Sequence, residues 1–149
     1  MGKNLNRSLV TGGTGFIGSA LVKRLVKNGH EVIVFDNDFR GSKERLSSIS
    51  DKITLIEGDI RDLKQVKNAV ENCNNIFHLA FINGTRFFYE KPELVLEVGV
   101  KGALNTLEAA LEAKVNTYVL ASSSEVYQEP TEFPTSEKER AIIPDVNNS

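Results

Sequence analysis

The sequence predicts an α/β fold, a doubly wound parallel sheet with five strands in the order 3-2-1-4-5. Two observations lead to this prediction. Short apolar runs rich in β-branched residues alternate with segments of helical periodicity, a pattern typical of a parallel sheet covered on both faces. Right-handed crossovers between parallel strands then leave few topologies, of which the doubly wound sheet is the natural one.

Strands and helices are expected to alternate from residue 7 to residue 122. The strands are expected within residues 7–13, 31–36, 52–59, 75–80 and 117–122. The helices are expected at residues 16–28, 42–49, 62–72 and 92–113, and the second of these is short and weak. Gly29 is placed to end the first helix, Asp62 to cap the third, and Pro92 is tolerated in the first turn of the fourth.

The composition of the chain changes after Tyr127. Residues 1–127 are expected to form one domain, since they contain all of the predicted strands and helices. Residues 128–149 hold three of the four prolines and many charges, so we expect an irregular polar segment there. We also expect the fifth strand to be a bare edge, through which the chain could form a homo-oligomer.

Composition excludes several classes of function. A hydrophobic content of 40% and a charged content of 26% are typical of a globular domain. A net charge of −2 argues against nucleic acid as a partner, and no apolar run approaches the roughly 20 residues of a membrane span. One cysteine and no signal peptide favour a cytoplasmic location. With two separated histidines and that single cysteine, we expect no metal site of the zinc type.

The turn TGGTGFIG carries the first functional signal. Gly12 allows a tight turn, Gly15 allows a pyrophosphate to approach the backbone, and Gly18 allows the helix to pack close to the sheet. The turn lies between a predicted strand and a predicted helix, whose free N–H groups would face the anion. Asp36 ends the second strand at roughly the 20-residue offset of a ribose-binding carboxylate. The pattern predicts a dinucleotide site, with a purely structural turn as the alternative.

Asp36 also bears on the choice of dinucleotide. A carboxylate at this place accepts hydrogen bonds from a ribose 2′-hydroxyl and repels a 2′-phosphate, which favours NAD over NADP. Arg40 and Lys43 follow in the next loop. Each is either a phosphate ligand or a solvated charge, and we favour the solvated charge.

Five motifs in order resemble the extended short-chain dehydrogenase/reductase family, which contains nucleotide-sugar epimerases and dehydratases with a Rossmann cofactor domain. The motifs are VTGGTGFIGSALVKRL, DNDFRGS, GDIRD, FHLAF and ASSSEVY. The resemblance implies NAD as the cofactor, an adenine-contacting turn at GDIRD, and a fourth strand that ends against the cofactor. The residues that it implicates in cofactor binding are Gly12, Gly15, Phe16, Ile17, Gly18, Asp36, Asn37, Asp59, Ile60, Leu79, Ala80 and Phe81.

The motif ASSSEVY resembles the catalytic Ser/Thr region of this family. By that resemblance Ser123 is the hydroxyl that holds the reacting sugar oxygen, with Ser124 as the alternative. Glu125 stands directly before Val-Tyr, as in dehydratases and UDP-glucuronate decarboxylases, where a glutamate assists proton transfer. The alternative for Glu125 is a carboxylate with no chemical role.

Two features depart from the family pattern. The catalytic Tyr-x-x-x-Lys pair is absent, because none of Tyr89, Tyr118 and Tyr127 has a lysine four residues later. Gly99 stands where family members often carry an asparagine near the nicotinamide. The chain is therefore expected to be the NAD-binding portion of a larger enzyme, incomplete relative to the family, and inactive on sugars by itself.

The resemblance implies that the parent enzyme is an epimerase, a dehydratase or a decarboxylase acting on a nucleotide sugar. Which of these reactions and which sugar are left open, since the substrate-binding half is not in the sequence. Two other functions stay open as alternatives. One is a non-catalytic dinucleotide-binding module, and the other is an NADP-dependent carbonyl reductase.

Overall fold

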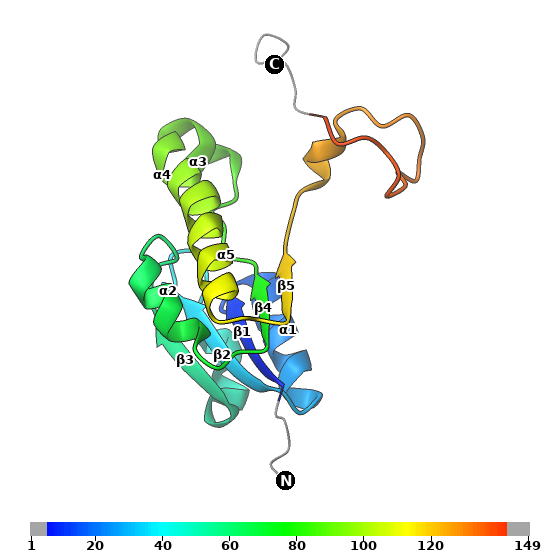
Figure 1. Ribbon diagram of the computed structural model, residues 1–149. Coiled ribbons are helices and arrows are strands. Elements are labelled where there is room, and N and C mark those ends of the chain that lie inside the picture. The colour runs from blue at the N-terminus through cyan, green and yellow to red at the C-terminus, as the bar shows by residue number, and fades with distance from the viewer. Residues whose placement is uncertain (1–5, 143–149) are drawn as a thin grey trace.

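Five parallel strands form one sheet in the structure, a computed structural model that describes residues 6–142 (Figure 1). Their order is β3-β2-β1-β4-β5, so the predicted topology is confirmed. The strands are β1 (Arg7–Thr11), β2 (Glu31–Asp36), β3 (Ile53–Glu57), β4 (Asn75–His78) and β5 (Thr117–Leu120). Because all neighbouring pairs are parallel, the carboxyl ends meet at one edge of the sheet, called here the carboxyl edge.

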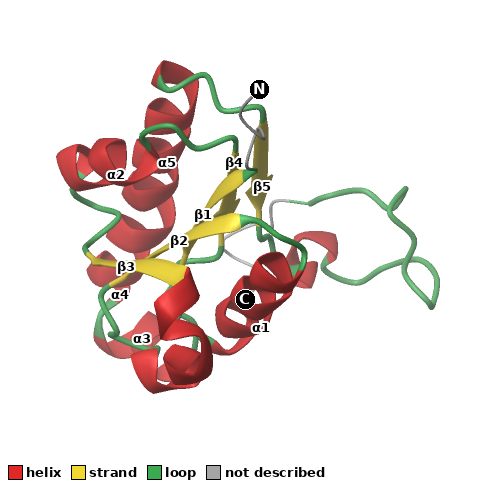
Figure 2. Cartoon of the chain, turned by 90° about the horizontal axis from the view of Figure 1, so that it is seen from below, coloured by secondary structure: helices red, strands yellow, loops and turns green. Residues whose placement is uncertain are grey.

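Helices cover both faces of the sheet (Figure 2). The α-helices are α1 (Phe16–Lys27), α2 (Leu63–Val70), α3 (Thr85–Glu90), α4 (Pro92–Leu96) and α5 (Gly102–Glu112). The 3-10 helices are η1 (Lys43–Lys52) and η3 (Ser124–Tyr127), and the π-helical turn η2 (Glu97–Lys101) joins α4 to α5. Helices α1 and η1 pack on one face, whereas α2 and α5 pack on the other.

The sheet separates two apolar cores, because successive side chains of a strand point to opposite faces. The core toward α1 and η1 contains Val10, Val22, Leu25, Val32, Val34 and Leu46. The core toward α2 and α5 contains Leu9, Ile33, Phe35, Ile60, Val66, Ala69, Val70, Cys73, Ile76, Ala109 and Ala110. The central strands are thus buried on both faces, which explains their continuous apolar sequences.

Local signals place most helix ends where the sequence predicts them. The Asp62 carboxylate accepts hydrogen bonds from the backbone N–H groups of Lys64 and Gln65, at 2.9 and 3.2 Å. Gly29 follows the end of α1 with a φ of +83°, a left-handed conformation suited to glycine. The predicted long helix begins at Pro92 and continues through α4, η2 and α5. Neither the π-helical turn nor α3 is among the sequence-based predictions.

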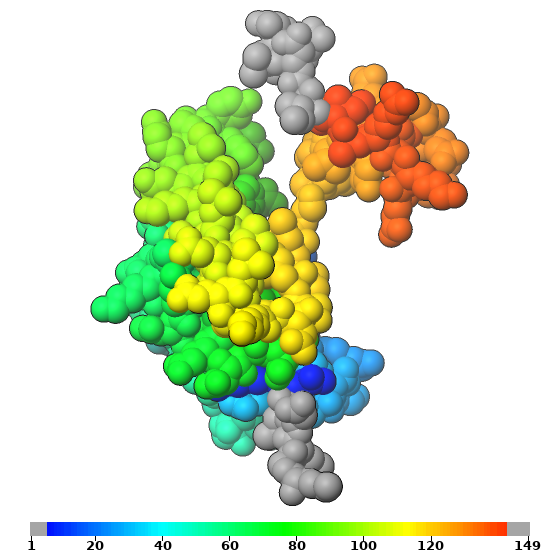
Figure 3. All heavy atoms as spheres, in the orientation of Figure 1, coloured from blue at the N-terminus to red at the C-terminus, as the bar shows by residue number. Residues whose placement is uncertain are grey.

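The chain leaves the sheet after β5. Within the described residues β5 pairs with β4 alone and forms one edge of the sheet, and Val119 and Leu120 are 42% and 51% exposed. The following segment projects beyond the carboxyl edge, away from the helices (Figures 1 and 3). Residues 128–142 contain no helix or strand, and the rest of the expected irregular segment lies outside the described residues. No helix within residues 6–142 has the length and apolarity to cross a membrane.

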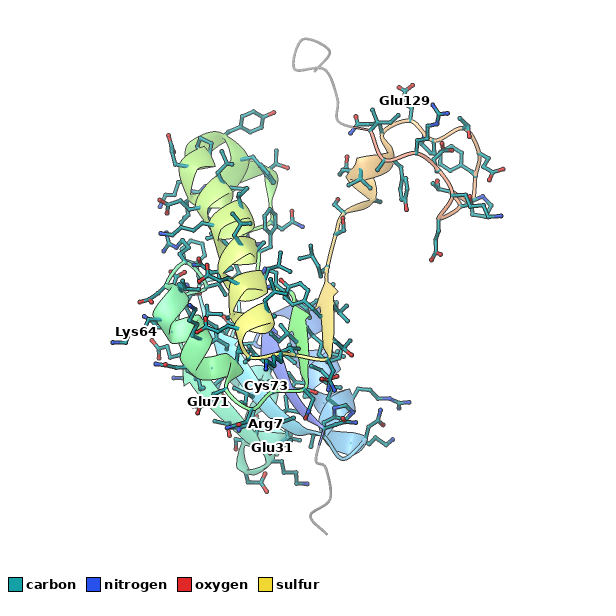
Figure 4. The ribbon with its side chains drawn as sticks, viewed as in Figure 1. Arg7, Glu31, Lys64, Glu71, Cys73 and Glu129 are labelled. Carbon is teal, nitrogen blue, oxygen red and sulfur yellow. The ribbon has the colours of Figure 1, made fainter. Side chains whose placement is uncertain are left out.

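The opposite edge of the sheet carries structural contacts. Arg7 and Glu31 begin β1 and β2, and their side chains form an ion pair at 3.1 Å (Figure 4). Cys73 is buried near this pair, and burial raises the pKa of its thiol to about 11. A thiol that stays protonated is a poor nucleophile and a poor metal ligand. Cys73 is therefore a core residue.

A buried histidine ties the ends of β1 and β4 together. His78 is 4% exposed, and its Nδ1 lies 2.7 Å from the hydroxyl of the fully buried Thr11. That hydroxyl oxygen also accepts hydrogen bonds from the backbone N–H groups of Leu79 and Ala80, each at 3.3 Å. Its own hydrogen is then available only to Nδ1, so the histidine carries its proton on Nε2. Burial lowers the pKa of His78 to about 4, which keeps the ring neutral.

Gly18→Ala is expected to destabilise the fold. A Cβ atom at this position would stand 2.1 Å from the carbonyl oxygen of Gly12 and 2.8 Å from the Cα of Gly13, so backbone must move. We expect a loss of about 1–3 kcal/mol or more in the free energy of unfolding, measured by denaturant titration. The matched control is Gly15→Ala, whose Cβ would meet one atom at 3.1 Å and whose φ of −67° suits alanine. Equal stability of the two variants would contradict this packing argument.

His78 is expected to make the stability of the fold fall in acid. Between its usual pKa of 6.5 and the folded value of about 4, the unfolded chain binds a proton that the folded chain does not. The free energy of unfolding should therefore decrease as the pH falls through this window, by on the order of 3 kcal/mol in total. His78→Asn keeps an acceptor near Thr11 but has no proton to gain, so its decrease should be smaller. Parallel pH dependence of both proteins in denaturant titrations would refute this role.

Candidate functional site

A groove opens at the carboxyl edge between the ends of β2, β1 and β4. It encloses about 580 Å³ of empty space, counting the part open to solvent. Its walls include the glycine turn, the loop after β2, the turn after β3 and the segment after β4. The lining residues are Gly12, Phe35, Asp36, Asn37, Phe39, Arg40, Gly41, Gly58, Asp59, Ile60, Leu79, Ala80, Phe81, Ile82 and Val98.

The glycine turn contributes Gly12 to the lining of this groove. Gly12 has a φ of +70°, and a Cβ atom there would stand 2.7 Å from the backbone nitrogen of Ala80. The Gly12 N–H donates to the carbonyl of Phe35 at 3.0 Å, while its own carbonyl accepts from Gly15 at 3.1 Å. Glycine at 12 is therefore required both by the backbone conformation and by the close approach of the end of β4.

Helix α1 begins directly after this turn. Gly15 is its extended N-cap residue, and no side chain caps the helix. The first N–H groups of an α-helix lack partners within the helix, and the helix dipole adds a partial positive charge there. The side chains of Phe16 and Ile17 are 86% and 70% exposed. No side-chain oxygen accepts a capping hydrogen bond at the start of α1, which is thus suited to an anion.

Asp36 is held in place by the turn it faces. One carboxylate oxygen accepts the N–H of Thr14 at 2.9 Å, and the other accepts the N–H of Asp38 at 2.9 Å. Each oxygen keeps a free lone pair, so the carboxylate can still accept hydrogen bonds from a ligand. Asn37 beside it also lines the groove, and its side-chain oxygen accepts the N–H of Phe39 at 3.1 Å.

An arginine that the sequence-based predictions omit organises the turn after β3. Arg61 donates to both carboxylate oxygens of Asp59, at distances from 2.6 to 3.1 Å, and also to Glu97 of η2 at 2.8 Å. The hydrogen bonds from Arg61 lower the pKa of Asp59. Asp59 is thus a fixed carboxylate at the wall of the groove. No local sequence signal reveals this link, since Glu97 lies 36 residues from Arg61.

Ile60, also predicted as a cofactor contact, is mainly a packing residue. Its side chain is 5% exposed and fills the space that a Cβ atom of Gly102 would occupy, 2.3 Å from its Cδ1. The Asn105 amide donates to the Ile60 carbonyl at 2.8 Å, which fixes the turn to α5. Ile60 reaches the groove as part of its wall.

Phe81, like Leu79 and Ala80, lines both the groove and a second cavity. That cavity is lined by His78, Leu79, Ala80, Phe81, Gly99, Ala103, Leu120 and Ala121. A Cβ atom at Gly99 would stand 2.7 Å from the Phe81 ring, so the ring occupies the place of a side chain at 99. The missing side chain of Gly99, which departs from the family pattern, therefore leaves the space that the Phe81 ring fills.

The predicted catalytic residues lie apart from this groove. Ser123, Ser124 and Glu125 follow the carboxyl end of β5, and all three are exposed in the projecting segment. The Ser123 hydroxyl accepts the N–H of Glu125 at 3.2 Å and so caps η3. The structure does not bring these side chains to the lining of the groove, and their catalytic role stays a prediction. Within residues 6–142, no cluster of three or more His, Cys, Asp or Glu side chains is arranged to hold a metal ion.

Comparisons with known proteins identify relatives of this chain. The NAD dependent epimerase/dehydratase family matches residues 8–148. UDP-N-acetyl-alpha-D-glucosaminuronate decarboxylase of Bacillus cytotoxicus is 38% identical over 125 residues, which are 84% of this chain and 39% of that protein. The chain thus spans about two fifths of the length of this relative.

Solved structures with the same fold are also similar to this chain in sequence. The epimerase Mth375 of Methanothermobacter thermautotrophicus superposes with a TM-score of 0.86 at 32% identity, over 93% of this chain and 42% of that one. UDP-glucose 4-epimerase of Thermus thermophilus, solved in complex with NAD, gives 0.81 at 33% identity, over 91% and 44%. By its sequence and its fold, the chain belongs to the NAD dependent epimerase/dehydratase family.

Proposed function

We propose that this chain binds NAD in the carboxyl-edge groove, as the cofactor-binding part of an enzyme that converts a nucleotide sugar. One observation carries the proposal. The uncapped start of α1 follows the glycine turn, and Gly12 of that turn lines the groove together with the fixed Asp36 carboxylate. An anion site beside a hydroxyl-binding carboxylate is what a dinucleotide requires.

The residues of the groove fit the parts of NAD. The pyrophosphate would lie over the glycine turn and the first N–H groups of α1, where Gly15 leaves the approach clear. Asp36 would accept the hydroxyls of the adenosine ribose, and the turn of Asp59 and Ile60 would border the adenine. Leu79, Ala80 and Phe81 would border the nicotinamide half. Bound NAD supplies reversible hydride transfer, and the name of the family states its dependence on NAD.

The substrate proposal rests on the relatives. Two of the relatives named above act on UDP-sugars by their names, one as a decarboxylase and the other as a 4-epimerase. We propose a nucleotide sugar for the complete enzyme, held at its reacting hydroxyl by Ser123 or Ser124, with Glu125 assisting proton transfer. The sequence contains no Tyr-x-x-x-Lys pair to act as the general base. These residues alone therefore do not complete the proposed reaction.

Calorimetric titration with NAD and NADP tests the cofactor assignment. We expect NAD to bind more tightly than NADP, because the Asp36 carboxylate repels a 2′-phosphate. Gly15→Ala should weaken NAD binding by about ten-fold or more, because its methyl group obstructs the backbone hydrogen bonds to the pyrophosphate. The stability of this variant should change little, since its backbone conformation suits alanine.

The matched control is Ser48→Ala, at an exposed position of η1 that does not line the groove. It should bind NAD as tightly as the parent chain. Tighter binding of NADP, or unchanged NAD binding by Gly15→Ala, would contradict the proposed site.

A further inference from the structure

The loop after β2 and the segment after β4 meet at the mouth of the groove. The Arg40 guanidinium donates from Nη1 to the carbonyl of Asn83, and its central carbon lies 5.2 Å from the centre of the Phe87 ring. The Phe39 ring lies 5.6 Å from the same ring, so Phe87 contacts both residues of the loop. Gly84 leaves space for this arrangement, since a Cβ atom there would stand 3.3 Å from Nη1 of Arg40.

These contacts give Arg40 a packing role in addition to the solvated charge favoured from the sequence, and its side chain stays exposed. Arg40 and Asp36 line the same groove. In dinucleotide sites of this kind, an arginine near the ribose carboxylate is the group that accommodates a 2′-phosphate. A guanidinium binds phosphate best in a bidentate manner, with two N–H groups directed at its oxygens. Here one Nη1 N–H group is directed at Asn83, and the central carbon of the guanidinium lies over the Phe87 ring.

We propose that Phe87 and Asn83 sequester Arg40 from the ribose end of the groove and so strengthen the preference for NAD over NADP. This inference rests on the proposed NAD site. Asp36 supplies one part of the discrimination by repelling the 2′-phosphate. The contact with Phe87 supplies a second part, because it holds away the one cation of the groove lining that could compensate for that repulsion.

The contribution of the contact between Arg40 and Phe87 to the NAD preference is small, because this contact is exposed to solvent. Arg40 is exposed, and Phe39 is 48% exposed. Cation–π contacts at exposed sites are weak, so releasing Arg40 should change the ratio of NADP to NAD affinity by about two- to five-fold. The gain involves a charged guanidinium and a charged phosphate in partly exposed surroundings, and it should therefore shrink as salt is added.

The test compares dissociation constants for NAD and NADP, at low and high salt, among the parent chain and its variants. Phe87→Leu keeps apolar bulk against Phe39 but removes the aromatic face under Arg40. We expect it to raise the affinity ratio toward NADP by about two- to five-fold at low salt. Arg40→Gln together with Phe87→Leu should show no such rise, because the guanidinium is gone.

Phe88→Leu is the matched control. Phe88 is on the same helix, but its ring pairs with Phe81 at 6.5 Å and not with Arg40. The affinity ratio should stay at the parent value in this variant. An unchanged ratio in Phe87→Leu, or a rise that persists without Arg40, would overturn the inference while leaving the NAD site intact. Binding of neither dinucleotide by the parent chain would refute the proposed function and this inference together.

Discussion

The close approach of three backbone segments at the glycine turn determines the geometry of the carboxyl edge. Gly12 touches the backbone at Ala80, and Gly18 touches Gly12, with no space for a Cβ atom at either position. The turn therefore brings the start of α1, the end of β1 and the end of β4 together. The Thr11 hydroxyl, oriented by neutral His78, holds the last N–H groups of the β4 end beside that turn. A side chain at position 12 or 18 would push these backbone segments apart and so change the geometry of the groove.

Much of this arrangement could be predicted from the sequence, because its signals are local. The apolar runs of the buried strands, the Asp62 cap and the glycine after α1 each act within a few residues of the chain. The order of strands follows from crossover handedness once the alternation is recognised. Asp36 was identifiable since it ends β2, and parallel strands bring their carboxyl ends to the same edge.

The parts that could not be predicted depend on contacts between distant residues. Arg61, which holds Asp59, also binds Glu97, 36 residues further along the sequence. Arg40 contacts Asn83, 43 residues further along, and Phe87 beyond it. Ile60 lines the groove as expected of a cofactor contact, and the missing side chain of Gly102 also gives its side chain a place in the core. Ser123 and Ser124 lie at the start of a short 3-10 turn, and no residue of this turn lines the groove. Their position outside the groove lining has no counterpart in a local sequence pattern.

An amide NMR titration with NAD tests most directly whether the glycine turn and the end of β4 form one ligand site. Backbone amides report the position of a ligand without any substitution in the chain. The account predicts that the largest shifts fall on residues 12–18 and 79–81, which meet at the carboxyl edge. The largest shifts at the opposite edge of the sheet, around Arg7, Glu31 and Cys73, would contradict it.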